Sequence, residues 1–204
     1  MGSLARLLSQ QGYEVINLGY PSRKYPIATL VQRFIAPVFS ELRGASHIDV
    51  ITHSLGGILF RYYLAHHAST EIANTIQRVI MLAPPNHGSE VADHIKGWPW
   101  ARWLLGPAMA ELGAGDDSVP NLLLDAERQG FPCEIGIVAG TRSYEPWFSR
   151  WISDANDGKV SVPSTRLPGM KDFIEVTAGH TFIMEDKVVR RQILSFLRGG
   201  EFYH

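Results

Sequence analysis

The chain has 204 residues, 45% of them hydrophobic and 19% charged, with a formal net charge of -1 at neutral pH. This size and composition predict one globular domain over residues 1–204, long enough to bury a core. The near-neutral charge excludes the basic surface of a nucleic-acid-binding protein, and no apolar run is long enough for stable insertion into a membrane. The single cysteine, Cys133, excludes an intrachain disulfide. A free thiol fits a reducing compartment, so we expect a cytoplasmic protein unless a signal preceded Met1.

Hydrophobic periodicity predicts an alternation of helices and strands along the chain. Spaced apolar residues predict helices over residues 4–11, 27–42, 55–67 and 185–197, the second kinked at Pro37, which lacks a backbone N–H. Short β-branched runs predict strands near residues 14–20, 47–52, 78–83, 134–139 and 172–177. Such alternation, with nearly continuous apolar strands, predicts an α/β fold with a doubly wound, mostly parallel sheet and helices on both faces.

The periodicity fails over residues 86–130. This stretch is rich in tryptophan and proline and has a Gly/Asp-rich patch at 113–117. We expect an excursion of short helices laid over the sheet rather than a second domain.

The most informative stretch runs from Ile48 to Phe60. An apolar β-branched run leads to Ser54, two glycines follow, and helical apolar spacing begins directly afterwards. This is the layout of a nucleophile elbow, in which a sharp strand-to-helix turn presents a serine hydroxyl above a sheet. The usual pattern is G-x-S-x-G, and Thr52 takes the place of the first glycine. A buried strand–helix junction with an incidental serine would have the same local sequence.

Other residues that follow the predicted strands can activate a serine. The carboxyl ends of parallel strands lie at one edge of a sheet. Ser54 follows the second strand, a loop with Asp154 and Asp157 follows the fourth, and His180 follows the fifth. A serine hydroxyl needs an imidazole to take its proton and an acid to orient that imidazole. The chain order of serine, aspartate and histidine therefore predicts nucleophilic catalysis at this edge.

Four segments together resemble the α/β-hydrolase superfamily, and small bacterial lipase- or esterase-like members in particular. They are THSLGG at 52–57, LAPPNHGS at 82–89, NDGKV at 156–160 and the Gly179–His180 pair. The resemblance extends through essentially the whole chain. It implies a triad of Ser54, Asp157 and His180, with the Leu55 N–H stabilising the oxyanion and with His53 packed beside the site as a substrate-binding residue. It implies no cofactor.

The resemblance also gives the excursion at 86–130 a role as a cap over the site. A cap of this kind would bind an acyl chain or an aromatic alcohol through Trp98, Trp100, Trp103 and Leu104. The alternative is that these side chains only pack the excursion onto the sheet.

Three further alternatives concern the site. Asp154 competes with Asp157 as the acid, and His87, which follows the third strand, competes with His180 as the base. A metal site has little support, because the histidines are scattered and no H-E-x-x-H helix is present.

The chain departs from the family pattern at its front. Family members begin with one or more strands, and a His-Gly loop leads from the last of these into the helix matched here by residues 3–11. That loop supplies the second oxyanion donor. We therefore expect a truncated or compact variant, in which the strands around Val15 and Val50 pair directly or leave a gap that another chain fills, making a homo-oligomer.

The function expected from these residues is hydrolysis of a small-molecule carboxylic ester through an acyl-enzyme, slow and confined to short-chain or activated esters. Two alternatives are a catalytically silent protein of the same fold that binds an apolar ligand or partner, and an acyltransferase that uses the same triad.

Overall fold

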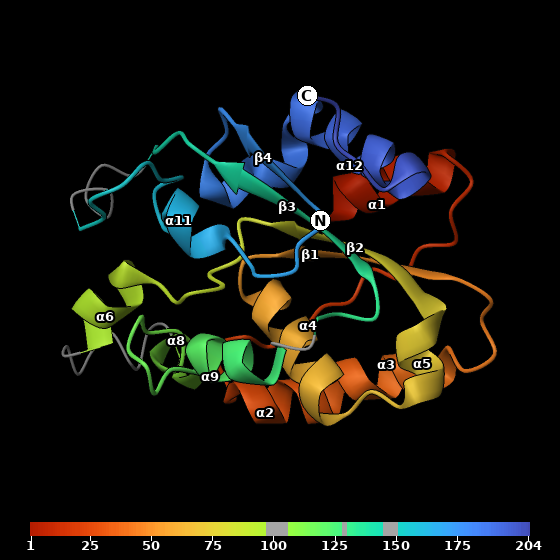
Figure 1. Cartoon of the computed structure of the whole chain (residues 1–204), viewed down its shortest axis with the longest axis horizontal. Helices are drawn as coiled ribbons and strands as arrows, with labels where there is room; N and C mark the ends of the chain where they lie inside the picture. Colours follow the sequence, from red (N-terminus) through yellow and green to blue (C-terminus); the bar gives the residue numbers. More distant parts are fainter. Residues whose placement is uncertain (97–105, 128–129, 145–150) are drawn as a thin grey trace.

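A computed structural model describes residues 1–96, 106–127, 130–144 and 151–204. Within these ranges the chain forms a sheet of parallel strands in the order β1-β2-β3-β4 (Figure 1). The strands are β1 (Ile48–His53), β2 (Ile76–Leu82), β3 (Glu134–Gly140) and β4 (Asp172–Val176). Four of the predicted strands are therefore confirmed, with bounds that differ by at most two residues at each end.

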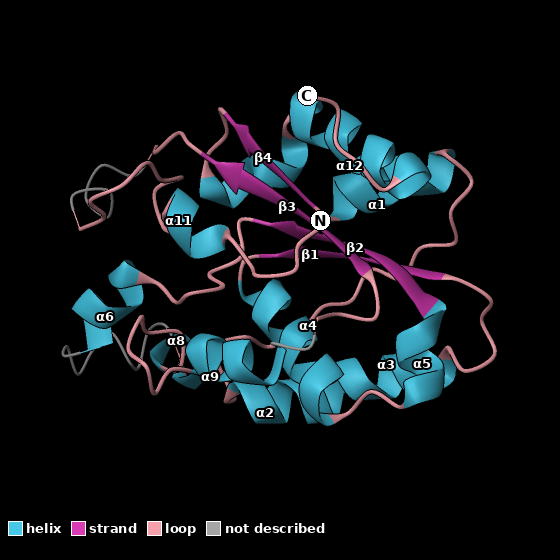
Figure 2. Ribbon diagram, viewed as in Figure 1, coloured by secondary structure: helices cyan, strands magenta, loops and turns pink. Residues whose placement is uncertain are grey.

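Helices cover both faces of the sheet (Figure 2). The helices α1 (Gly2–Gln10) and α12 (Lys187–Gly199) lie on one face, and α4 (Leu55–His66) and α5 (Thr70–Thr75) lie on the other. The central strands are therefore shielded from solvent on both sides, which explains why their sequences are nearly continuous apolar runs rather than alternating ones. The α/β architecture predicted from the sequence is confirmed.

Alternate residues of β2 belong to two separate hydrophobic cores. Val79 and Met81 pack with the α4 face, whereas Ile80 and Leu82 pack with the α1 and α12 face. Successive side chains of a strand point to opposite faces of the sheet, so one strand supplies both cores. All four side chains are fully buried.

The predicted helix over residues 27–42 is divided into three parts. These are α2 (Ile27–Leu30), a π-helical turn η1 (Val31–Ile35) and α3 (Ala36–Glu41). Pro37 cannot donate to the Arg33 carbonyl, and the Ala36 N–H donates to Val31, five residues back, in place of the usual four. The kink predicted at Pro37 is thus a π-helical turn followed by a new helix start.

The strand predicted at residues 14–20 is wrong. Residues 13–20 have no regular secondary structure, and β1 pairs only with β2 in the described part of the chain. Ile16 and Leu18 are 56% and 37% exposed. A β-branched segment forms a strand only where a neighbouring strand accepts its backbone hydrogen bonds, and no strand in the described ranges pairs with this one. Direct pairing of the Val15 and Val50 segments is therefore also wrong.

Short helices follow β2, as expected for the excursion. They are α6 (Glu90–Lys96), α8 (Pro107–Ala110) and α9 (Val119–Ala126). Figure 1 places α6 and α8 toward the side of the molecule where the strands end, and α9 packs against α4. No helix within the described ranges has both the length and the apolar character needed to cross a membrane.

Candidate active site

Ser54 lies at the sharp turn between β1 and α4. Its backbone has φ 53° and ψ -124°, a conformation that residues other than glycine rarely adopt. The Ser54 N–H donates to the Leu82 carbonyl at 2.9 Å, which ties the turn to the end of β2. The turn therefore has the strained geometry of a nucleophile elbow.

Small residues after the serine allow this turn to pack tightly. A Cβ added to Gly57 would lie 3.0 Å from the Cβ of Pro84, and one added to Gly56 would lie 3.5 Å from the Cβ of Thr52. The contact at Gly57 would be tighter than an ordinary carbon contact, whereas the one between Gly56 and Thr52 would be an ordinary van der Waals contact.

A chain of hydrogen bonds joins Ser54, His180 and Asp157. The Ser54 Oγ lies 2.9 Å from His180 Nε2, and His180 Nδ1 lies 2.7 Å from Asp157 Oδ2. The Asp157 side chain is 1% exposed and that of His180 is 7% exposed. The structure therefore brings together the serine, histidine and aspartate that the sequence analysis selected.

Main-chain hydrogen bonds fix the orientation of Asp157. Its Oδ1 accepts from the N–H groups of Lys159 at 3.0 Å and Val160 at 2.9 Å, which leaves Oδ2 facing His180. The Asp157 carbonyl also accepts from the His180 N–H at 3.0 Å. The competing Asp154 is exposed, so it is Asp157 that lies against the imidazole.

Gly140 has a role in the site that was not predicted from the sequence. This glycine ends β3, and a Cβ on it would lie 2.8 Å from the Cβ of Asp157 and 2.5 Å from the Ala178 carbonyl oxygen. The acid loop and the histidine loop converge over a residue that must lack a side chain. A glycine at the carboxyl end of a buried strand was the available signal.

The Leu55 N–H lies at the first position of α4, directly after Ser54. The first N–H groups of a helix have no acceptor within that helix, and the helix dipole makes this end partly positive. The group is therefore suited to stabilise negative charge that develops beside the Ser54 hydroxyl.

His53 packs against His180, with their ring centroids 5.0 Å apart. Its Nε2 lies 2.9 Å from the His180 carbonyl oxygen. Burial, together with the nearby His180, lowers the pKa of His53 to about 4. His53 is therefore neutral at physiological pH.

Four of the five residues predicted to bind substrate lie outside the described residues. They are Trp98, Trp100, Trp103 and Leu104. Their expected contact with substrate stays a prediction.

A buried ionic cluster lies behind the elbow, and the sequence analysis missed it. Arg61 of α4 is fully buried and donates from Nε and Nη2 to the Glu127 carboxylate, at 2.7 Å for the shortest contact. Its remaining donors reach the Asn86 carbonyl, the Asn86 side chain and the Pro120 carbonyl. One guanidinium thus ties α4 to the loop after β2 and to the α9 region.

His87, the alternative base, lies on this loop after β2. Its main-chain N–H donates to the Ser164 carbonyl, and burial and the nearby Arg61 lower its pKa. It is His180 whose ring reaches Ser54. Over the described ranges, no three His, Cys, Asp or Glu side chains are grouped as metal ligands.

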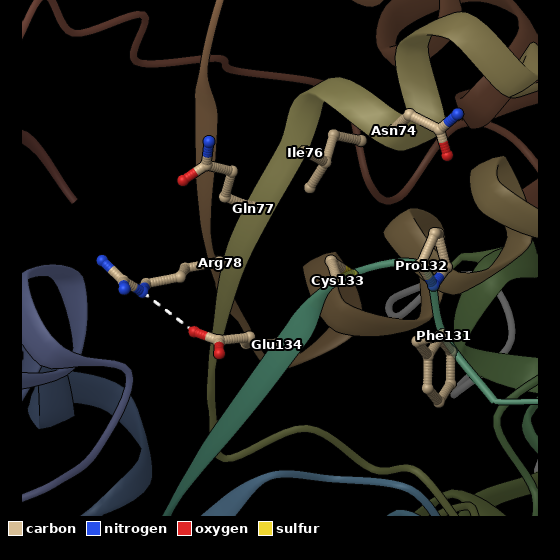
Figure 3. Close-up of a pocket in the computed structure, with 8 residues that line it drawn as sticks. All are labelled: Asn74, Ile76, Gln77, Arg78, Phe131, Pro132, Cys133 and Glu134. Carbon is tan, nitrogen blue, oxygen red and sulfur yellow. Dashed lines mark hydrogen bonds and ion pairs between the residues drawn. The ribbon is translucent and has the colours of Figure 1, made fainter.

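A cavity of about 500 Å³ lies at the opposite end of the sheet, where β2 and β3 begin (Figure 3). Arg78 and Glu134 form an ion pair at its wall, with Arg78 Nε 3.0 Å from Glu134 Oε2. Burial raises the pKa of the Cys133 thiol to about 12, so this sulfur is protonated and a poor nucleophile.

The fold is similar to that of several solved hydrolase structures. The mature form of the Bacillus licheniformis lipase BlEst2 aligns over 97% of this chain and 82% of its own, with a TM-score of 0.74 and 21% identity. The chain has the α/β-hydrolase fold. No protein-family model matches the sequence. No curated protein matches it either.

Two further solved structures align with this chain over a smaller share of their own length. The phospholipase PlaB from Legionella pneumophila aligns over 81% of this chain and 42% of its own, with a TM-score of 0.64 and 23% identity. The metagenomic carboxyl esterase MGS0156 aligns over 78% of this chain and 52% of its own, with a TM-score of 0.60 and 20% identity. The aligned part of this chain therefore spans about half the length of each of these proteins.

Proposed function

We propose that this protein is a serine hydrolase that cleaves small-molecule carboxylic esters. The observation that carries the proposal is the hydrogen-bonded chain from Ser54 through His180 to Asp157, placed on a strained elbow at the start of α4. The names of the similar structures, a lipase, a phospholipase and a carboxyl esterase, support the same class of reaction.

The geometry suggests a role for each residue. His180 Nε2 takes the proton of the Ser54 hydroxyl as Oγ attacks the ester carbonyl, and the Leu55 N–H stabilises the resulting oxyanion. Asp157 accepts from His180 Nδ1–H, so it holds the imidazole in the required tautomer and stabilises the imidazolium. The imidazolium then protonates the departing alcohol. Water, deprotonated by the same imidazole, releases the acid from the acyl-enzyme and regenerates Ser54.

We expect slow turnover that is limited to short-chain or activated esters. Within the described residues, the Leu55 N–H is the oxyanion donor that we can assign, and loss of one donor typically reduces kcat by about 10²- to 10³-fold. An activated ester needs less help from oxyanion donors, because its electron-withdrawing leaving group makes the carbonyl carbon more electrophilic and stabilises the oxyanion inductively. A series of p-nitrophenyl esters of increasing acyl length tests this expectation, and efficient hydrolysis of long-chain triglyceride would contradict it.

Labelling with a fluorophosphonate probe tests the nucleophile directly. The probe phosphonylates a serine only when a neighbouring base activates it, so wild-type protein should be labelled and the Ser54→Ala variant should not. A Ser9→Ala variant is a matched control, because Ser9 is exposed on helix α1.

The same experiment separates the alternatives. Absence of labelling in the wild-type protein would favour a silent protein of this fold that binds a ligand or partner. Labelling at Ser54 without hydrolysis of any ester in the series would favour acyl transfer to an acceptor other than water, and trapping the acyl group with added alcohols or amines would identify that acceptor.

A further inference from the structure

His53 contacts the backbone of the residue that carries the proposed base. His53 ends β1, and its Nε2 lies 2.9 Å from the carbonyl oxygen of His180. The His180 peptide groups are thereby held on two sides, because the His180 N–H donates to the Asp157 carbonyl at 3.0 Å. The ring of His180 then extends from this fixed backbone to Ser54 on one side and Asp157 on the other.

The chemistry of this contact determines the tautomer of His53. A carbonyl oxygen can only accept a hydrogen bond, so the proton must be on His53 Nε2, and Nδ1 of the neutral ring carries none. The charged groups that act on this ring are His180, Asp157 and the chain's amino terminus. Because His53 stays neutral, it can hold His180 without repelling the imidazolium that forms during the reaction.

We propose that His53 is a positioning residue, which holds the main chain at His180 through its Nε2–H so that the imidazole faces both Ser54 and Asp157. This inference rests on the proposed hydrolase function. It differs from a role in substrate binding, because the contact is to the enzyme backbone and not to a surface that a substrate would occupy.

Two substitutions separate the hydrogen bond from simple packing. His53→Gln places an amide N–H the same number of bonds from Cβ as the imidazole Nε2, so it can restore the donor. His53→Phe keeps a planar ring of similar size and removes the donor, leaving the His180 carbonyl unsatisfied in a mostly buried place. We expect kcat to fall about 10- to 100-fold in the Phe variant, as for the loss of one such buried hydrogen bond.

The expected pattern is specific to positioning. KM for a p-nitrophenyl ester should be nearly the same in wild type and both variants, and kcat should recover in the Gln variant to within about 3-fold of wild type, since a neutral hydrogen bond is restored. Equal kcat in the Phe variant and wild type would overturn the proposal. A change confined to KM would also overturn it, because this would indicate substrate contact.

Nuclear magnetic resonance of the histidine ring nitrogens tests the contact without any catalysis. We expect His53 as the Nε2–H tautomer, uncharged down to about pH 5, and a shifted His180 signal in the Phe variant. The Nδ1–H tautomer would overturn the proposal. If wild-type protein hydrolysed no ester while His53 had the expected tautomer, the proposed function would fail and the positioning contact would still be supported.

Discussion

The strained backbone of Ser54 predicts that glycine at this position stabilises the protein. Ser54 has φ 53° and ψ -124°, and such a conformation costs a residue with a side chain on the order of 1–3 kcal/mol. Glycine removes this strain, but it gives the unfolded chain more freedom, which opposes folding by about 0.4–1 kcal/mol. We therefore expect Ser54→Gly to be about 1 kcal/mol more stable than Ser54→Ala.

The alanine variant is the proper reference for this comparison. Both substitutions remove the Ser54 hydroxyl and its hydrogen bond to His180, so this loss cancels in the difference between them. Neither variant should hydrolyse esters. Urea denaturation gives the difference in free energy of unfolding, and in a thermal scan the glycine variant should melt about 2–4 °C higher than the alanine variant. A glycine variant that is less stable than the alanine variant would refute the argument that the elbow is strained.

Three other predictions follow from buried groups. Glu127→Gln should destabilise the fold by about 3–5 kcal/mol, because it leaves the fully buried Arg61 guanidinium without its anionic partner. Urea titration measures this loss, and the double variant Arg61→Met with Glu127→Leu should recover much of it. Asp157→Asn should lower kcat on the order of 10⁴-fold, as removal of the orienting carboxylate does in serine hydrolases. Asp154→Asn is the control and should have the wild-type kcat. The reverse result would make Asp154, and not Asp157, the acid that orients His180. The lowered pKa of His53, about 4 against 6.5 in the unfolded chain, means that the unfolded state binds the extra proton first as pH falls. The free energy of unfolding of the wild-type protein, compared with that of His53→Gln, should therefore be constant above pH 6.5 and fall by about 3 kcal/mol between pH 6.5 and pH 4. Parallel curves of unfolding free energy against pH for wild type and His53→Gln would contradict this.

The fold could be predicted well where a segment is buried on both sides. The run from Val79 to Leu82 is fully buried, and its apolar sequence is what identified it as a strand. The run at residues 14–20 has the same type of sequence and is not a strand. Strand formation depends on a neighbour that accepts the backbone hydrogen bonds, and no pattern within one segment reports whether that neighbour exists.

The residues that position the site were harder to predict than the residues that would do the chemistry. Asp157 was selected over Asp154 from a family resemblance, whereas in the structure Gly140 provides the space and two main-chain N–H groups orient the carboxylate. Arg61 and Glu127 lie 66 positions apart in the sequence. Each resembles an ordinary surface charge until the fold buries both, so their pairing has no local signal.

The edge of β1 opposite β2 has no paired strand in the described part of the chain. β1 is paired on one side by β2, and no described strand covers its other side. Such an edge presents backbone N–H and C=O groups that can accept an added strand. We propose that a second copy of the chain pairs here, which analytical ultracentrifugation would detect as a concentration-dependent dimer, and a monomer at all concentrations would contradict it.

A strand added at this edge would bind to the same element that ends at His53 and leads into Ser54. Any partner that binds the folded edge and not the unfolded chain raises the stability of the folded state by mass action. Self-association at this edge would therefore make the stability of the element that carries Ser54 depend on protein concentration.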